Sequence, residues 1–349
     1  MLLLTFRDLV YRRTRFIVVI VLGAVVFALL FVMTGLVEQF NTEPVDTVEA
    51  IGADTWVVPE GISGPFTALS AAPAAAIDAV EASNKAAVVT SRSGLVDEPD
   101  GHAVEVILVG HEVDALGTPP TSEGRPAAAS GEVALDESLG LSVGDEVMIV
   151  GRPFTVVGET KRTTLLAGLP LVFVVLSDAQ ELTFGSDEVI SGVLVEGEPS
   201  SIPPGAKTMS ADEVADSVLE PLEGAIASID LVRALLWIVA AIIVGAVVYL
   251  SALERQRDFA VLKAVGAPNR ALLGSLALQA VLVALLAVGV AAILQIFLAE
   301  QFPLEVTVPS RAFWQLPLLA VVMALIAGVI GMRKVLKADP SQAFAGAGV

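Results

Sequence analysis

The stretch ALERQRDFAVLKAVGAPNRALL, Ala252–Leu273, is charged and amphipathic, and it lies between two long apolar runs. In its middle, Phe259, Leu262 and Val265 recur at helical spacing, and the charged residues occupy other positions. Gly266 then opens a Gly-Ala-Pro-Asn turn, which ends a helix because proline disfavours helical geometry in the residue before it. The sequence therefore predicts a short amphipathic helix between two apolar segments.

The apolar runs define the class of protein. The chain has 349 residues, of which 55% are hydrophobic, and its mean hydropathy of +0.77 is typical of a membrane protein. Four runs, at residues 16–37, 234–253, 271–299 and 312–332, contain no Asp, Glu, Lys or Arg, and each reaches the roughly 18–20 residues that cross a bilayer. We predict an α-helical membrane domain of four transmembrane helices in a 1 + 3 arrangement, at residues 16–37, 231–253, 271–299 and 312–332.

The charges divide the chain in two. Residues 38–230 hold 33 acids and 7 bases, a net charge of 7 − 33 = −26, and the remainder holds 13 bases and 6 acids, a net charge of 13 − 6 = +7. The 193 residues of the acidic segment are enough to bury a core of their own. We therefore expect a separate water-exposed domain between the first two spans.

The orientation follows from the bases in the short segments beside the spans. They are concentrated in the N-terminal segment 1–15, the loop 254–270 and the tail 333–349, whereas the loop 300–311 has only Arg311. By the positive-inside rule, the three base-rich segments are cytosolic and residues 38–230 are extracytoplasmic. The bases expected to anchor the first span at anionic headgroups are Arg12, Arg13 and Arg15.

The extracytoplasmic segment has a mixed α/β pattern. Strands are predicted at residues 54–58, 103–109, 146–150, 154–157, 171–176 and 189–195, with a hairpin at Gly151-Arg152-Pro153. Helices are predicted at 73–83, at 177–183 after a Ser177 cap, at 210–219 with a Ser210/Glu213 capping box, and from Glu223 into the second span. The segment 117–131 is expected to be a loop.

No catalytic or metal signature is present in this sequence. The chain has no Cys and no Gly-x-Ser-x-Gly elbow, and His111 has no second His four residues on. His102 and His111 are expected at solvated loop or edge-strand positions, and Asp97–Asp100 in a solvated turn. The uncharged runs of the predicted spans contain no Asp, Glu, Lys, Arg or His, which disfavours an ion relay; Gln279 and Gln295 are their main candidate buried polar groups. No catalytic residue and no metal is assigned.

Physical reasoning alone leaves three roles for the amphipathic helix. It could lie on the lipid interface, join two spans as an inert connector, or insert into a groove of a cytosolic partner, where the small residues Ala264, Gly266 and Ala267 would allow close approach. Composition does not choose among them.

The motif LERQRDFAVLKAVGAPNRALL resembles the segment after the second span in FtsX/MacB-like ABC-transporter permeases. That pattern runs roughly Glu-Arg-x-x-Glu-Ile-Gly-x-Leu-Lys/Arg-Ala-Ile-Gly-Ala, and Ala260 departs from it where the family has Gly. The segments 138–145, 152–158 and 334–340 also resemble family segments. The positions that match the motif, and are thereby expected to couple to an ATPase, are Glu254, Arg255, Asp258, Phe259, Leu262, Lys263, Ala264, Gly266 and Ala267.

The resemblance implies mechanotransmission, in which two permease copies pair with two copies of a cytosolic ABC ATPase that binds ATP and Mg. This chain has no phosphate-binding loop and is expected to be non-catalytic. The implied partners are the ATPase, a second permease copy, the lipid bilayer and an extracytoplasmic lipoprotein or adaptor, and not nucleic acid. The implied activity is export of a lipid, lipoprotein or peptide. The alternatives are a membrane-tethered sensor or binding protein, or a regulator of a cell-wall hydrolase, without translocation.

Overall fold

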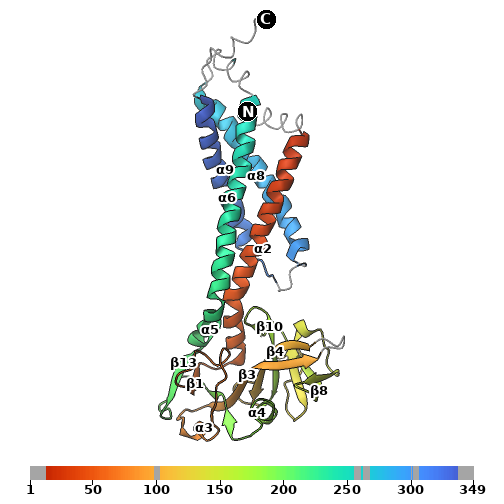
Figure 1. Cartoon of the computed structure of the whole chain (residues 1–349), viewed down its shortest axis with the longest axis vertical. Coiled ribbons are helices and arrows are strands. Elements are labelled where there is room, and N and C mark those ends of the chain that lie inside the picture. Colours follow the sequence, from red (N-terminus) through yellow and green to blue (C-terminus); the bar gives the residue numbers. More distant parts are fainter. Residues whose placement is uncertain are drawn as a thin grey trace. The chain divides into compact units, whose positions relative to one another are not determined.

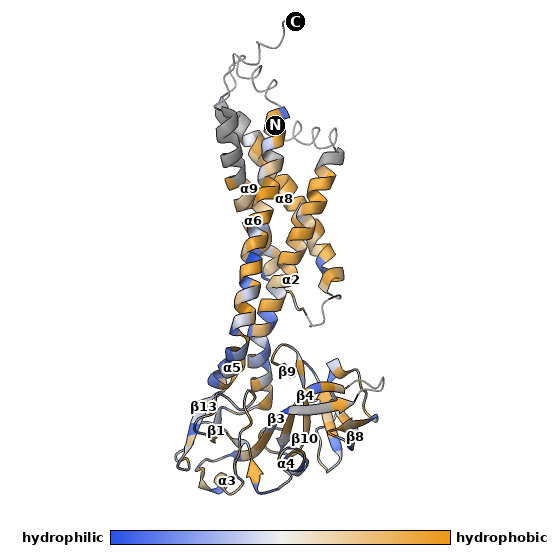
Figure 2. Cartoon of the chain, viewed as in Figure 1, coloured by the Kyte–Doolittle hydropathy of each residue, from blue (hydrophilic) through white to orange (hydrophobic). Residues whose placement is uncertain are grey.

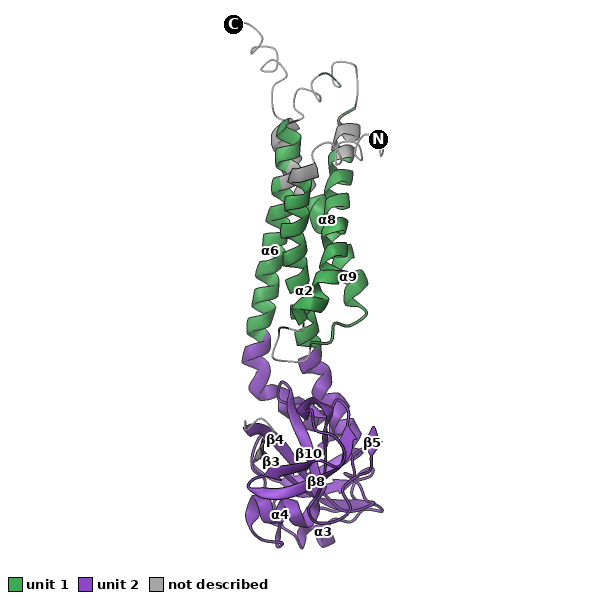
Figure 3. Ribbon diagram, turned by 90° about the vertical axis from the view of Figure 1, so that its right-hand side faces the viewer, with its two compact units in different colours: residues 1–38, 227–349 green, residues 39–226 purple. Residues whose placement is uncertain are grey.

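The computed structural model forms two compact units (Figures 1 and 3). One comprises residues 1–38 and 227–349, and the other comprises residues 39–226. The residues that the structure describes are 13–97, 103–254, 261, 268–299, 301 and 306–336.

The helices of the first unit are long and apolar, as their hydrophobic colouring in Figure 2 shows. They are α2 (Arg13–Ile51), α6 (Glu223–Glu254), α8 (Asn269–Ala299) and α9 (Ala312–Leu336), of which α2 and α6 extend beyond this unit. Within the described residues, three helical segments are long and apolar enough to cross a membrane, and Ala312–Ile326 is a shorter apolar helix. The prediction of a helical membrane domain is thus confirmed, with three such segments and one shorter helix.

Small and aromatic side chains together pack this helical unit. Ala24, Ala28, Ala284, Ala291 and Ala320 are all at most 1% exposed. Phe27 meets Trp237 edge-on at 6.1 Å between ring centroids, and Phe31 lies 5.2 Å from Phe313. Close approach at alanines with aromatic rings filling the gaps is how helices associate where lipid supplies no hydrophobic drive.

The second unit is built on one mixed sheet. Its strand order is β13-β1-β12-β3-β4-β10-β6-β8-β5, with β7 paired to β3 and β8, and β9 to β10. The pairs β4–β10 and β6–β8 are parallel and the other pairs are antiparallel. The strands are β1 (Thr55–Pro59), β3 (Lys85–Asp97), β4 (Ala103–His111), β5 (Glu123–Gly124), β6 (Glu132–Asp136), β7 (Glu146–Ile149), β8 (Arg152–Thr160), β9 (Thr164–Leu165), β10 (Leu169–Val175), β12 (Gly192–Val195) and β13 (Ala206–Ser210), and β2 (Ala72–Pro73) pairs with β11 (Val189–Ile190) in a separate ribbon.

Alternation along the strands divides the core between the two faces of the sheet. On one face, side chains such as Val89 and Leu108 pack with α4 (Leu176–Phe184) and α3 (Ala76–Ala79). On the other, neighbours such as Val88 and Ile107 pack with α5 (Ala211–Leu219) and the last turn of α2. The predicted mixed α/β domain is confirmed, with both faces of its sheet covered.

Two predicted helices differ from the structure. The expected helix at 73–83 is only the four-residue α3, because Pro73 lies in strand β2, Val80 is extended, and the Lys85 ammonium donates to the carbonyls of Ile77 and Val80. Helix α4 begins at Leu176, one residue before the expected Ser177 cap, because strand β10 runs directly into it and Val175 is its N-cap.

Other local predictions are confirmed. The Ser210 hydroxyl accepts from Glu213 N–H and the Glu213 carboxylate accepts from Ser210 N–H, which is the expected capping box of α5. The hairpin between β7 and β8 turns at Val150 and Gly151, both at positive φ (48° and 75°), so the turn lies one residue earlier than expected.

Candidate functional site

The residues predicted to couple to an ATPase fall almost entirely outside the described part of the chain. Glu254 is the last residue of α6. Arg13 and Arg15 open α2, and Arg12 lies outside the described residues. The described residues also exclude eight of the predicted coupling residues, namely Arg255, Asp258, Phe259, Leu262, Lys263, Ala264, Gly266 and Ala267. The structure instead describes how α2 and α6 are joined to the second unit, residues 39–226, which we call the outer domain.

Helix α2 ends in a polar clamp around the loop 161–168. Glu43, Asp46 and Thr47 lie at helical spacings of three and four, on one face of α2. Glu43 accepts from the Gly168 N–H at 2.9 Å, Asp46 pairs with Arg162 at 3.0 Å, and the Thr47 hydroxyl donates to the Thr164 carbonyl at 2.8 Å. Sequence reasoning missed this clamp, since its partners are more than 110 residues apart along the chain.

The clamped loop holds an unusual backbone. Arg162, Leu166 and Ala167 have φ of 57°, 53° and 69°, in the left-handed region that costs non-glycine residues free energy. Asp136, only 1% exposed, accepts from the Thr163 N–H at 2.8 Å and hydroxyl at 2.9 Å, and from the Ser138 N–H at 3.0 Å. The carboxylate thus fixes the loop in the shape that α2 contacts.

The second helix, α6, is linked to the sheet through α5. The short 3-10 turn η2 (Glu220–Leu222) carries Pro221 and joins α5 to α6. Val214 and Val218 of α5 pack in one buried cluster with Trp56 of β1 and with Ile51 from the end of α2. Helices α2 and α5 therefore pack on the same face of the sheet, around one tryptophan, and α6 follows α5 in the chain.

In the helical unit, the segment 306–311 contacts α2. Arg311 pairs with Glu38, and a Cβ at Gly35 would meet the Val306 side chain at 2.8 Å, so glycine is needed for this approach. Gln279 and Gln295 are 3% and 7% exposed, as expected for buried polar groups. Gln279 Nε2 lies 3.4 Å from the Ser251 hydroxyl.

No metal site is found among the described residues, which contain no group of three or more His, Cys, Asp or Glu side chains able to hold an ion. His102 lies outside them, as do residues 98–100, and Asp97 ends β3. His111 was expected at a solvated loop or edge position, and this is wrong. It ends the interior strand β4 and is fully buried, with Nδ1 3.0 Å from the Glu112 carbonyl.

Burial gives His111 a testable pH dependence. Desolvation lowers its pKa below 6.5, and its Nε2 has no hydrogen-bond partner within the described structure. Below about pH 6.5 the imidazole of His111 therefore binds a proton more readily in the unfolded chain than in the folded domain. The contribution of neutral His111 to stability is complete above about pH 6.5 and is lost as the pH falls below that value. We expect the urea midpoint of the outer domain to fall between pH 7.5 and 5.5, and less steeply in His111→Leu. Equal slopes for both proteins would contradict this.

Known proteins are similar to this chain over its whole length. An FtsX-like permease C-terminal model matches residues 231–340, and a MacB-like periplasmic core domain model matches residues 16–209. An uncharacterized ABC transporter permease of Mycobacterium tuberculosis (strain ATCC 25618 / H37Rv) is 40% identical over 351 residues, covering 99% of this chain and all of the relative. A more distant relative, "Putative hemin transport system permease protein HrtB" of Staphylococcus epidermidis (strain ATCC 12228 / FDA PCI 1200), is 25% identical over 65% of this chain and 67% of its own.

Two solved structures show weaker likeness. The extracellular domain of the transporter YknZ from Gram-positive bacteria is 16% identical, with a TM-score of 0.29, over 47% of this chain and 87% of that one. The periplasmic region of MacB from Actinobacillus actinomycetemcomitans is 14% identical, with a TM-score of 0.34, over 51% and 98%.

Apolar helices long enough to cross a membrane, together with a mixed α/β domain, define a membrane protein with an extracytoplasmic segment. The matches to both halves of the chain identify its class as an ABC transporter permease. The chain belongs to the FtsX/MacB-like permease family, as the motif at residues 253–273 indicated.

Proposed function

We propose that this permease works by mechanotransmission, converting ATP-driven motion of a separate cytosolic ATPase into motion of its outer domain. Two copies of the chain would pair with two ATPases, which bind the ATP and Mg, and the assembly would export a lipid, lipoprotein or peptide. The observation that carries the proposal is helical continuity. Helices α2 and α6 run without interruption for 39 and 32 residues, and each includes both apolar sequence and residues of the outer-domain unit.

The topology that goes with this proposal has four spans, cytosolic termini and residues 38–230 outside. The distribution of bases supports the orientation, and the short apolar helix Ala312–Ile326 supplies the fourth span when residues 327–332 extend it. An extracytoplasmic lipoprotein or adaptor would contact the outer domain. The cytosolic loop 254–270 would then lie where an ATPase can reach it.

The coupling role falls on the family-motif residues from Glu254 to Ala267. We expect the small residues Ala264 and Gly266 to allow close contact with the ATPase, because a larger side chain would hold the two surfaces apart. Ala264→Arg and Gly266→Glu should each lower ATPase association or permease-dependent turnover about tenfold, the size of an ordinary coupling free energy.

The measurement is ATP hydrolysis by the ATPase encoded beside this gene, reconstituted with the full-length permease in lipid nanodiscs, with complex formation and folding assayed separately. Ala347→Arg, in the tail predicted to lie on the same side of the membrane, is the matched control and should leave both readouts unchanged. If no ATPase associates, or both loop substitutions leave association and turnover intact, the proposal fails and a tethered sensor replaces it.

A further inference from the structure

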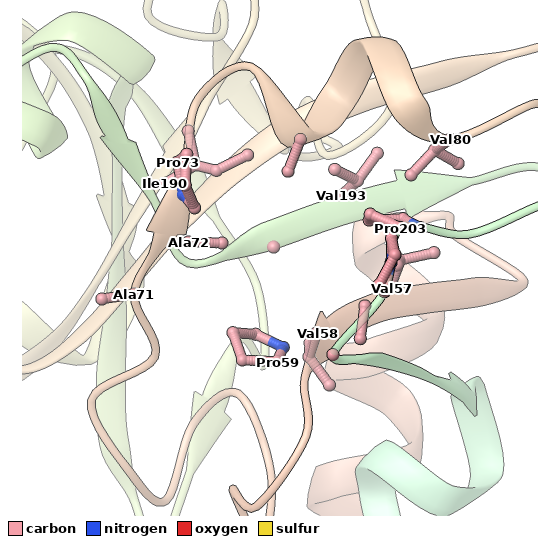
Figure 4. A pocket seen from close by; sticks show the side chains of 15 residues that line it. Val57, Val58, Pro59, Ala71, Ala72, Pro73, Val80, Ile190, Val193 and Pro203 are labelled. Carbon is pink, nitrogen blue, oxygen red and sulfur yellow. The ribbon is translucent and has the colours of Figure 1, made fainter.

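The outer domain contains a cavity of about 380 Å³ on the face of the sheet opposite Trp56. Strands β1 and β12, the segment 71–80 and the turn 203–205 surround it (Figure 4). Its volume falls in the range of small-molecule sites. The size of this cavity makes it a candidate ligand site within the domain that the permease would move.

The lining of the cavity is entirely aliphatic. All fifteen lining residues are Val, Ile, Ala, Pro or Gly, so no lining side chain carries a nitrogen, oxygen or sulfur atom. Four of them are prolines, which have no N–H to donate. The side chains of the cavity therefore offer a ligand apolar contact only, and any polar recognition would come from the backbone.

This lining excludes several ligand classes. Without Phe, Tyr or Trp the cavity has no face on which a planar aromatic ring could stack. Without His, Met, Cys or Tyr it has no axial ligand for haem iron. A polar or charged side chain of a peptide would find no polar side chain there to pair with, which is costly in an apolar site.

Part of the cavity's lining belongs to the buried core of the domain. Its inner side chains Val57, Val193 and Ile190 are only 1–3% exposed although they line it. Pro73 and Pro203, from separate segments, stand at its edges (Figure 4). An aliphatic lining without a ring face for stacking suits a flexible chain of methylene groups better than a planar ring system.

The charge of the surrounding domain restricts the ligand further. Residues 38–230 have a net charge of −26, which disfavours the approach of an anionic ligand such as a free fatty acid to this domain. We propose that this cavity binds one acyl chain of a lipid or lipidated molecule whose headgroup is not a bare carboxylate. The inference rests on the proposed function. Among the exported substrates proposed there, it favours one that carries an acyl chain.

The test is photo-crosslinking of a monoacylglycerol that carries a diazirine in its sixteen-carbon chain to the full-length permease in nanodiscs. We expect crosslinks within residues 71–80 and 190–206. Ala76→Trp, which fills the cavity from the first turn of α3, should lower them about tenfold. Ala79→Trp, on the same short helix but exposed and outside the lining, is the matched control and should crosslink like the wild type.

Unlabelled monoacylglycerol and a synthetic diacylated peptide serve as competitors, and the stronger one identifies the source of the acyl chain. Competition by neither, equal competition by hemin, or unchanged crosslinking in Ala76→Trp would each overturn the site. A second cavity variant, Ala206→Leu, and the thermal transition of each protein separate lost binding from lost folding. ATPase association, measured on the same samples, reports on the proposed function independently, because the crosslink requires no ATPase.

Discussion

Trp56→Ala should destabilise the outer domain by about 3–5 kcal/mol, the usual cost of removing a fully buried aromatic side chain. Trp56 is 0% exposed and meets Phe66 edge-on at 5.4 Å between ring centroids. At about 2–4 °C per kcal/mol for a domain of this size, the thermal transition should fall by roughly 10 °C. Thermal unfolding of the full-length protein, followed by near-ultraviolet circular dichroism, measures this effect.

The functional consequence comes from what this tryptophan supports. Its cluster includes Ile51 of α2 and Val218 of α5, so the space left by the missing indole ring would loosen the packing of α2 and α5 on the sheet. Trp56→Phe is the matched control, since the indole N–H has no hydrogen-bond partner in the described structure and its loss breaks none. We expect the phenylalanine variant to lose much less stability. Similar losses of stability in both variants would contradict the prediction that the buried volume of the Trp56 side chain holds α2 and α5 on the sheet.

Asp136→Ala should cost the outer domain roughly 3 kcal/mol, because two backbone N–H groups and a hydroxyl lose their buried acceptor. The loop 161–168 would then lose its strained shape, and the Glu43, Asp46 and Thr47 contacts of α2 would lose their partner surface. Hydrogen exchange of the full-length protein should show faster exchange at residues 161–168 than in the wild type.

Asp145→Ala is the control for this carboxylate. Asp145 also accepts from a backbone N–H, that of Ser142 at 2.9 Å, but it is exposed, so water can replace it. Its removal should cost less than about 1 kcal/mol. Protection of residues 161–168 that is unchanged in Asp136→Ala would disprove the role assigned to the clamp.

The helices were the most predictable part of the molecule. Runs of 20 or more uncharged residues define apolar helices regardless of their neighbours, and the Ser210/Glu213 box is a local signal that the structure confirms. The thirteen-residue strand β3 was missed, because its Ala, Ser and Gly residues have weak strand preference and pairing with β4 and β12 stabilises it instead.

The candidate functional residues also differ in how well the sequence predicted them. The family motif in the loop 254–270 is contiguous, so it could be recognised from the sequence alone, and its role in coupling stays a prediction. His111 was misplaced because solvent exposure depends on which strands flank β4, and local polarity does not report that.

By itself, the sequence determined that the chain enters a membrane, carries an acidic α/β domain and has the loop motif of an FtsX/MacB-like permease. These properties depend on hydrophobicity, charge and contiguous residues. Only the tertiary structure decided that Glu43 meets Gly168, that Asp136 holds Thr163, and that aliphatic residues from four distant segments enclose one cavity. Such contacts arise when the sheet brings remote segments together, and no local pattern encodes their partners.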